Sequence, residues 1–195
     1  SVEDILAVDA FMSEIETRLD QEKGSVGIMA LIETAKGLEN AFAIAGAAGR
    51  VKALFLGAED LTADLRCQRT KEGREIEYAR ARLVTAARAA GIDAYDTPFT
   101  DVTDDEGIRG DALVAKALGF SGKAAISPRH VEVINEVFSP SPADIEYAYE
   151  VMEAIRQAQA QGKGAVALRG KMVDAPIVAR ARQVIAMAEE MGMGR

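Results

Sequence analysis

Two short apolar runs in this chain are each followed directly by acidic residues. Residues 29–32 (MALI) lead into Glu33, and residues 54–58 (LFLGA) lead into Glu59 and Asp60. Short apolar runs that end in turn residues are typical of strands in a parallel sheet, and ligands gather at the carboxyl ends of such strands. Mg²⁺ favours one or two carboxylates, with water and substrate oxygens completing its octahedron. We therefore predict that Glu33 and Asp60 together bind Mg²⁺.

The adjacent acids Glu59 and Asp60 are predicted to have different roles. Successive strand residues point to opposite faces, so both reach one pocket only if the strand has already ended. We assign Asp60 as the metal ligand and give Glu59 a supporting role. The alternative for any single acid is that it caps the following helix or is solvated. Two acids that each end an apolar strand favour metal binding over this alternative.

Composition narrows the class of protein. The 195 residues carry a net charge of −8, which argues against nucleic acid as the main partner but leaves room for a nucleotide-bearing ligand. The single cysteine, Cys67, excludes an internal disulfide framework and fits a reducing compartment. No signal peptide is visible, and no apolar run approaches the roughly 20 residues that span a bilayer. We expect a cytoplasmic protein with no membrane partner.

Predicted helices and strands alternate along residues 1–140. The helices are predicted at 2–22, 36–48, 71–90, 106–118 and 131–138, and the strands at 29–32, 54–58, 92–99 and 123–127. A closed (β/α)8 barrel needs about 250 residues. Because no strand precedes the first helix, we expect an α/β fold that is the C-terminal half of a TIM barrel. Its open edge would need a cover that these residues do not provide.

Residues 141–195 do not continue the alternation, and we predict that they form a C-terminal helical and hairpin extension. A helix is expected at 143–161, with Ser141 and Asp144 as a capping box. A turn at 162–164, a hairpin of 165–168 with 171–173, and a last helix at 176–191 follow. The chain is thus divided into a half barrel, 1–140, and an appendage, 141–195.

Six phrases spread over nearly the whole chain carry a family resemblance. They are LIETAKGLENA (31–41), GAEDLTADL (57–65), DTPFTDVTDDEG (96–107), AKALGFSGKAAISP (115–128), INEVFSPS (134–141) and GKGAVALRGKMVDAP (162–176). In this order they resemble the citrate lyase beta-subunit-like family of the HpcH/HpaI aldolase superfamily. The resemblance implies a TIM barrel with a C-terminal extension, assembled as a homotrimer or hexamer. It also implies carbon–carbon lyase activity on 3-hydroxyacyl-CoA thioesters such as citryl-CoA, malyl-CoA or citramalyl-CoA.

The resemblance also assigns roles to three residues of this chain. Glu33 and Asp60 match the Mg²⁺-binding acids of the family, in agreement with their places at the strand ends. Asp174 matches an aspartate of the extension that reaches the active site of a neighbouring protomer and transfers a proton there. The alternative for Asp174 is a helix N-cap, because Pro176 lies two residues further on, where a first helical turn would begin.

Departures from the family keep other functions open. Arg66, Ser127 and Arg169 stand where the family usually has Gly, His and Asp, and the front of the barrel, with a substrate-contacting Arg, is missing from these residues. The main hypothesis is a Mg²⁺-dependent lyase that releases acetyl-CoA and a keto acid from a CoA thioester. The alternatives are a malyl-CoA-type thioesterase and a non-catalytic barrel subunit.

Other polar residues receive structural interpretations. His130, the single histidine, is expected at the surface or rim, and Cys67 is not expected to act as a nucleophile. Asp96 could support the metal site from behind. The basic residues after the second acidic pair could meet CoA phosphates or be solvated; they are Arg66, Arg69, Lys71 and Arg74.

Overall fold

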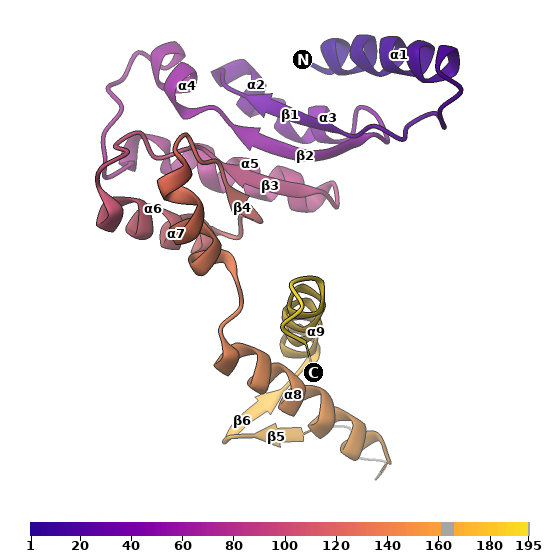
Figure 1. Cartoon of the computed structure of the whole chain (residues 1–195), viewed down its shortest axis with the longest axis vertical. Helices are drawn as coiled ribbons and strands as arrows, with labels where there is room; N and C mark the ends of the chain where they lie inside the picture. Colours follow the sequence, from indigo (N-terminus) through magenta and orange to yellow (C-terminus); the bar gives the residue numbers. More distant parts are fainter. Residues whose placement is uncertain (161–165, 195) are drawn as a thin grey trace. The chain divides into compact units, whose positions relative to one another are not determined.

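The computed structural model describes residues 1–160 and 166–194, which form two compact units, Ser1–Phe138 and Ser139–Arg195 (Figure 1). The first unit is built on a four-stranded sheet in the order β1-β2-β3-β4, and each neighbouring pair is parallel. The strands are β1 Ile28–Ile32, β2 Val51–Leu56, β3 Asp93–Asp96 and β4 Gly122–Lys123. The predicted α/β fold with a parallel sheet is confirmed. Among the described residues, this sheet has free edges at β1 and β4.

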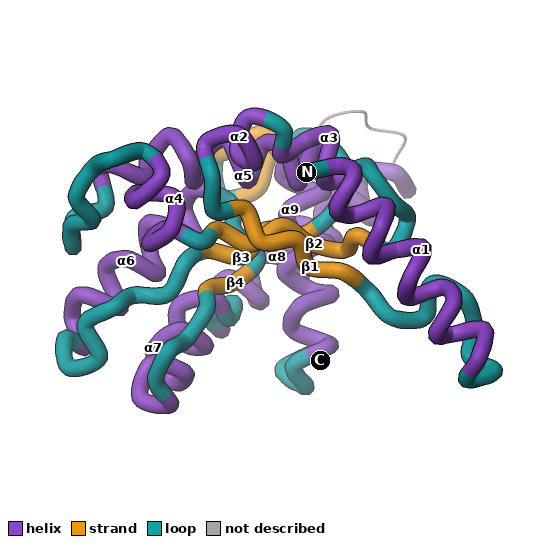
Figure 2. Tube along the Cα trace, turned by 90° about the horizontal axis from the view of Figure 1, so that it is seen from above, coloured by secondary structure: helices purple, strands orange, loops and turns teal. Residues whose placement is uncertain are grey.

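Helices cover one face of this sheet. The helices of this unit are α1 Val2–Arg18, α2 Ala35–Glu39, α3 Ala41–Ala45, α4 Ala58–Asp64, α5 Glu77–Ala89, α6 Asp105–Leu118 and α7 Pro128–Phe138, with the 3-10 turn η1 Arg74–Ile76 before α5. Figure 2 shows α2, α3 and α5 along one side of the strands. Leu54 and Leu56 of β2 and Leu83 of α5 are completely buried there. On the other face, Met29 and Leu31 of β1 are 55% and 47% exposed.

Several predicted elements differ from the observed ones, and helix α4 was not predicted. The helix predicted at 36–48 is split into α2 and α3, because the Asn40 side chain donates to the Lys36 carbonyl at the junction. The helix predicted from residue 71 begins only at η1, because Gly73 has a left-handed φ of 68°. The strand predicted at 123–127 is reduced to β4.

Helix α1 is attached mainly through one buried arginine. Large apolar side chains of this helix and of the residue after it are exposed, with Phe11 62% and Leu19 65% accessible. Arg50, at the start of β2, donates from both Nη atoms to the Glu16 carboxylate, at 2.8 and 2.9 Å. This hydrogen bonding, with the backbone N–H of Gly24, outweighs burial and holds the pKa of Glu16 down at about 2. The attachment of α1 is therefore an ion pair at neutral pH.

The second unit contains α8 Pro142–Ala160, β5 Val166–Leu168, β6 Lys171–Val173 and α9 Ala175–Glu190. The predicted capping box is confirmed, because Asp144 N donates to Ser141 Oγ and Ser141 N donates to Asp144 Oδ2, both at 3.1 Å. Strands β5 and β6 pair antiparallel about Arg169 and Gly170, as predicted. The turn predicted at 162–164 and residue 165 lie outside the described residues. None of the described helices combines the length and apolar character needed to cross a membrane.

Candidate functional site

Glu33 lies beside the point where β2 passes into α4. The strand ends are in register, with Ile32 opposite Leu56, and Gly57 N donates to the Ile32 carbonyl at 2.9 Å. Glu33 follows β1 directly and is half-buried. A Cβ atom on Gly57 would lie 2.8 Å from Glu33 Cβ and 3.2 Å from Glu33 Oε2. The glutamate side chain therefore occupies the space that the missing side chain of Gly57 leaves free.

Asp60 lies in the first turn of α4, and its residue is exposed. Because the strand ends at Leu56, the strand alternation that separated Glu59 from Asp60 does not apply; both acids belong to a helix. Glu59 lies 3.5 Å from Arg69 Nε, in the loop that follows α4. Glu33 thus follows β1 directly, and Asp60 lies in the helix that follows the paired strand β2.

Asp64, which the sequence reasoning did not single out, connects the two acidic segments. Its Oδ2 accepts a hydrogen bond from Ala35 N, two residues after Glu33, at 2.7 Å. Asp64 follows Asp60 by four residues on the seven-residue helix α4, so the two share a helix face. This i, i+4 acidic spacing was the available signal. Asp64 holds the chain after Glu33 against the helix that carries Asp60.

The carboxylates of Glu33 and Asp60 provide the oxygen ligands that a hard divalent cation prefers. Within the described parts of the chain, no group of three or more His, Cys, Asp or Glu side chains is placed to hold a metal ion. A site with two protein carboxylates is the open arrangement that Mg²⁺ uses when water and substrate oxygens complete its shell. The space beside Gly57 accommodates Glu33 Oε2 without an intervening side chain. The metal assignment of Glu33 and Asp60 stays a prediction.

Replacing Gly57 by alanine should weaken divalent-cation binding. The added Cβ would meet Glu33 Cβ at 2.8 Å, so Glu33 must move, while the backbone φ of −95° is ordinary for alanine. Overpacking costs about 1–3 kcal/mol, and we expect Mn²⁺ affinity, measured by electron paramagnetic resonance, to fall about 10-fold. Gly110→Ala, where no atom lies within 4 Å of the new Cβ, is the matched control. Equal affinity in both variants would show that Glu33 does not need this space.

Asp96 is engaged in a buried cluster of four charges behind the strand ends. Arg80 donates to Asp96 Oδ1 from Nε at 3.0 Å and to Asp96 Oδ2 from Nη2 at 2.8 Å. Lys123 Nζ donates to Asp96 Oδ2 at 2.6 Å, and Asp111 contacts both cations. The positive charges of Arg80 and Lys123 therefore neutralise the negative charges of Asp96 and Asp111. The four side chains come from α5, β4, β3 and α6. Asp96 thus forms ion pairs with Arg80 and Lys123, and its predicted support of the metal site stays a prediction.

The prediction that His130 lies at the surface or rim is wrong. The residue is completely buried, and its ring centroid lies 6.4 Å from that of Phe99. The reason is the early start of α7 at Pro128, which places His130 on the same face as Ile134 and Val137, both buried. The spacing of these three residues could have revealed the buried position.

The basic residues after α4 are partly neutralised by carboxylates. Arg69 Nη1 donates to Glu75 Oε1 at 2.6 Å. Lys71 Nζ lies 2.6 Å from Asp101 Oδ2 and 3.1 Å from Asp104 Oδ2, in the acidic loop before α6. The Lys71 ammonium, with the Thr103 N–H and hydroxyl, lowers the pKa of Asp101 to about 2. The predicted meeting of this cluster with CoA phosphates stays a prediction.

Asp174 belongs to the second unit and caps α9. Its Oδ1 accepts a hydrogen bond from Ile177 N at 3.1 Å, and Pro176 lies in the first turn. The helix-capping interpretation is therefore correct, and the catalytic assignment stays a prediction beside it. Arg169, a departure from the family pattern, has a left-handed φ of 49° at the hairpin turn and forms two 2.9 Å hydrogen bonds with Glu150.

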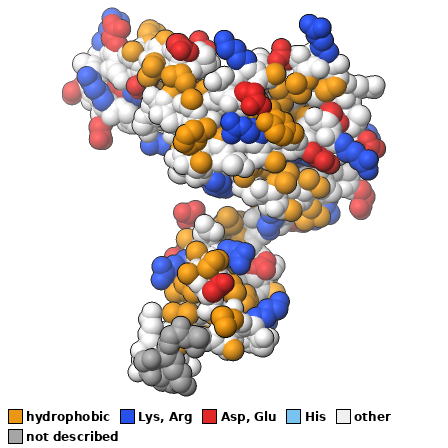
Figure 3. All heavy atoms as spheres, turned by 180° about the vertical axis from the view of Figure 1, so that it is seen from behind, with side chains coloured by type: hydrophobic (Ala, Val, Ile, Leu, Met, Phe, Trp, Pro, Cys, Tyr) orange, Lys and Arg blue, Asp and Glu red, His pale blue; other side chains and the backbone are white. Residues whose placement is uncertain are grey.

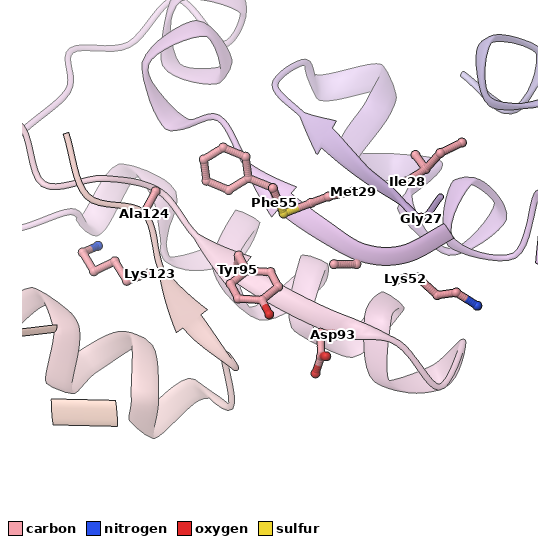
Figure 4. Close-up of a pocket in the computed structure, with 10 residues that line it drawn as sticks. Gly27, Ile28, Met29, Lys52, Phe55, Asp93, Tyr95, Lys123 and Ala124 are labelled. Atoms are coloured by element: carbon pink, nitrogen blue, oxygen red, sulfur yellow. The ribbon is translucent and has the colours of Figure 1, made fainter. Parts of the chain in front are cut away.

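An open pocket lies on the uncovered face of the sheet, and Glu33 and Asp60 are not part of it. Its volume is about 470 Å³, and its floor contains Met29, Phe55 and Tyr95 from β1, β2 and β3 (Figure 4). Glu33, Asp60 and Asp174 do not line it. Figure 3 shows exposed hydrophobic side chains interspersed with charges of both signs over the face that it displays. The pocket lies on the apolar side of the sheet, whereas Glu33 directly follows β1 and Asp60 lies in the first turn of α4.

Comparison with known proteins identifies relatives over nearly the full chain. The family model described as HpcH/HpaI aldolase/citrate lyase matches residues 1–128. The chain is 41% identical to the citrate lyase subunit beta of Haemophilus influenzae, over 97% of this chain and 65% of that protein. It is 36% identical to the L-malyl-CoA/beta-methylmalyl-CoA lyase of Rhodobacter capsulatus, over 95% of this chain and 64% of that protein. The chain thus spans slightly less than two thirds of these relatives.

Solved structures agree with this comparison. The protein CitE of Mycobacterium tuberculosis, in complex with magnesium, acetoacetate and coenzyme A, superposes with a TM-score of 0.72 at 33% identity, covering 84% of this chain and 61% of that one. A citrate lyase of Burkholderia xenovorans gives a TM-score of 0.83 at 22% identity, covering 98% of this chain and 62% of that one. The second likeness concerns the fold alone.

Proposed function

The chain belongs to the HpcH/HpaI aldolase/citrate lyase family, and from that premise we propose that it is part of a Mg²⁺-dependent carbon–carbon lyase. Its substrate would be a 3-hydroxyacyl-CoA thioester such as citryl-CoA, malyl-CoA or citramalyl-CoA. The observation that carries the proposal is that Glu33 directly follows β1 and fills the space left by Gly57, while Asp60 lies in the first turn of the helix that follows the paired parallel strand β2. The relatives support the substrate class, because they include a citrate lyase subunit, a malyl-CoA lyase and a protein in complex with magnesium and coenzyme A.

In this proposal the four-stranded sheet is the C-terminal half of a TIM barrel. Its parallel order and its free edges at β1 and β4 support that assignment. Glu33 and Asp60 then follow the carboxyl ends of the strands, where barrel enzymes place their active sites. Residues 139–195 are proposed as the extension that assembles a homotrimer or hexamer.

Glu33 and Asp60 would hold the metal through their carboxylate oxygens. A bound Mg²⁺ would supply positive charge that stabilises the hydroxyl and carboxylate oxygens of the substrate. The absence of a side chain on Gly57 leaves room for the Glu33 side chain. The hydrogen bond from Ala35 N to Asp64 holds the segment after Glu33 against α4. These contacts keep the two carboxylates on neighbouring elements before substrate arrives, which reduces the reorganisation that binding requires.

Asp174 is proposed as the proton-transfer residue, acting in the site of a neighbouring protomer. Cleavage breaks the substrate O–H bond and then the carbon–carbon bond, which gives a keto acid and the enolate of acetyl-CoA. The hydroxyl proton goes to a base, and the enolate carbon takes up a proton. The Asp174 carboxylate is exposed in the single chain, and an interface with a neighbouring protomer would exclude water from it and leave it free to exchange a proton with the substrate.

Asp174→Asn separates the catalytic role from the capping role. Asparagine caps helices as well as aspartate does, so capping alone predicts an unchanged protein. Proton transfer predicts a fall in turnover of at least about 100-fold in the complete protein, with Mn²⁺ affinity unchanged. Asp144→Asn, which alters the cap of α8 instead, is the matched control. Full turnover by Asp174→Asn would remove Asp174 from the mechanism.

Product analysis tests the reaction itself. The complete protein, supplied with Mg²⁺ and each of the three thioesters, should release acetyl-CoA and a keto acid. Free CoA with an intact hydroxy acid would instead indicate a thioesterase. Ser127, which lies four residues after β4 and accepts a hydrogen bond from Arg129 N at 3.3 Å, is the departure that we propose alters the substrate site. Absence of any product in a Mn²⁺-binding protein would indicate a non-catalytic barrel subunit.

A further inference from the structure

Helix α4, which carries Asp60, cannot cap its own N-terminus. The first N–H groups of a helix have no partner within the helix, and a Ser, Thr, Asp or Asn at the N-cap usually accepts one of them. The N-cap of α4 is Gly57, which makes no side-chain cap hydrogen bond. A side chain is excluded there, because its Cβ would approach Glu33 Cβ to 2.8 Å. Because Glu33 needs this space, α4, the helix that carries Asp60, has no N-cap side chain of its own.

Thr97 supplies the missing acceptor from the neighbouring strand. It follows β3 directly, is 1% exposed, and its Oγ1 accepts a hydrogen bond from Ala58 N at 3.3 Å. Ala58 is the first residue of α4, and its side chain is completely buried. The Thr97 hydroxyl, directly after β3, therefore accepts the hydrogen bond that an N-cap side chain of α4 would accept. The contact also fixes where α4 begins relative to the end of β3.

Thr97 is itself held by the buried charge cluster. Lys123 Nζ donates to the Thr97 carbonyl at 2.6 Å, and the same Nζ donates to Asp96 Oδ2 at 2.6 Å. The two cations Arg80 and Lys123 and the two anions Asp96 and Asp111 are all less than 9% exposed. Burying four charges is costly unless their mutual geometry is well defined, and that geometry leaves the Thr97 peptide little freedom.

We propose that Thr97 is a positioning residue that joins this buried cluster to the first turn of α4 and so places Asp60 against Glu33. The inference rests on the proposed metal role of these two acids. It differs from that role because Thr97 neither touches the metal nor supplies charge. Loss of its hydroxyl should loosen the start of α4 while both carboxylates remain in the chain.

Thr97→Val tests the proposal, with Thr97→Ser as the matched control. Valine keeps the shape of threonine and removes the acceptor, whereas serine keeps the hydroxyl. Loss of a helix cap predicts about fivefold weaker Mn²⁺ affinity for Thr97→Val, measured by electron paramagnetic resonance, and near-normal affinity for Thr97→Ser. Circular dichroism of each variant establishes that it is folded, and Thr97→Ala replaces Thr97→Val if that variant is not. Equal affinities for the hydroxyl-free variant and Thr97→Ser would overturn the proposal.

Hydrogen exchange of the Ala58 amide separates this inference from the proposed metal site. In metal-free protein, Thr97→Val should exchange this amide about fivefold faster than the unaltered chain, whereas Thr97→Ser should not. If the unaltered chain binds no Mn²⁺, the metal assignment fails, and faster exchange at Ala58 would still support the joining of β3 to α4 by Thr97. Unchanged exchange at Ala58 in Thr97→Val would overturn that joining, whatever the metal result.

Discussion

Asp60→Asn and Glu33→Gln are each expected to abolish Mn²⁺ binding to the chain at micromolar metal. Each change keeps the size and oxygen of the side chain but removes one of only two proposed protein carboxylates. Even groups that merely orient a ligand contribute about 10- to 100-fold to metal affinity, so loss of a ligand charge should cost at least about 100-fold. Titration of Mn²⁺ followed by electron paramagnetic resonance measures this directly, and turnover of the complete protein should vanish with it.

Glu59→Gln is the control for this prediction. It removes the same charge from the residue next to Asp60, but the Glu59 carboxylate lies 3.5 Å from Arg69 in the structure. The effect of Glu59→Gln on Mn²⁺ affinity should therefore be small. The same experiment measures how much the loss of one nearby negative charge weakens binding without loss of a ligand. If Glu59→Gln and Asp60→Asn weaken Mn²⁺ binding equally, Asp60 has no special role. If a folded chain binds no Mn²⁺ at all, the lyase proposal loses its central support.

The parallel sheet and the placement of the two acids could be predicted because both depend on local patterns. An apolar run of strand length followed by an acid is visible in the sequence, and parallel pairing brings successive strand ends to one edge. Glu33 was placed after β1 in this way, whereas the helix α4 that carries Asp60 was not predicted. Asp64 left a weaker signal, its spacing of four residues from Asp60, and only the structure shows that it reaches Ala35 N.

Close approaches between distant segments could not be predicted. Gly57 and Thr97 were both predicted within strands, 54–58 and 92–99, and nothing in the sequence indicates that they lie beside Glu33 Cβ and Ala58 N. Lys123 was expected in a short strand, without any indication that it is buried. Whether a lysine is solvated or paired inside depends on partners from four separate elements, and no periodicity within one segment encodes them.

The second large effect is expected from Lys123→Met. Methionine has nearly the length of lysine but no charge, so Arg80 alone would face Asp96 and Asp111, and one negative charge would be buried without a counterion. Removing one partner of a buried ion pair typically costs about 3–5 kcal/mol. The midpoint and free energy of urea unfolding should fall accordingly. Arg109→Met, which breaks the exposed pair with Glu136, should cost less than about 1 kcal/mol.

The pH dependence of this difference identifies its cause. Burial opposes ionisation of Asp111, but the charges of Lys123 and Arg80 outweigh it and hold the pKa of Asp111 below its usual value. A lowered pKa contributes stability that is present above the unfolded-state pKa, about 3.9 for Asp, and is lost as the pH falls through the folded-state pKa. The unaltered chain should therefore lose stability below about pH 4, whereas Lys123→Met, which already lacks the ion pair, should lose less. A gap in unfolding free energy that narrows on acidification would identify the buried charges as the source, and a gap independent of pH would assign the loss to packing around the methionine.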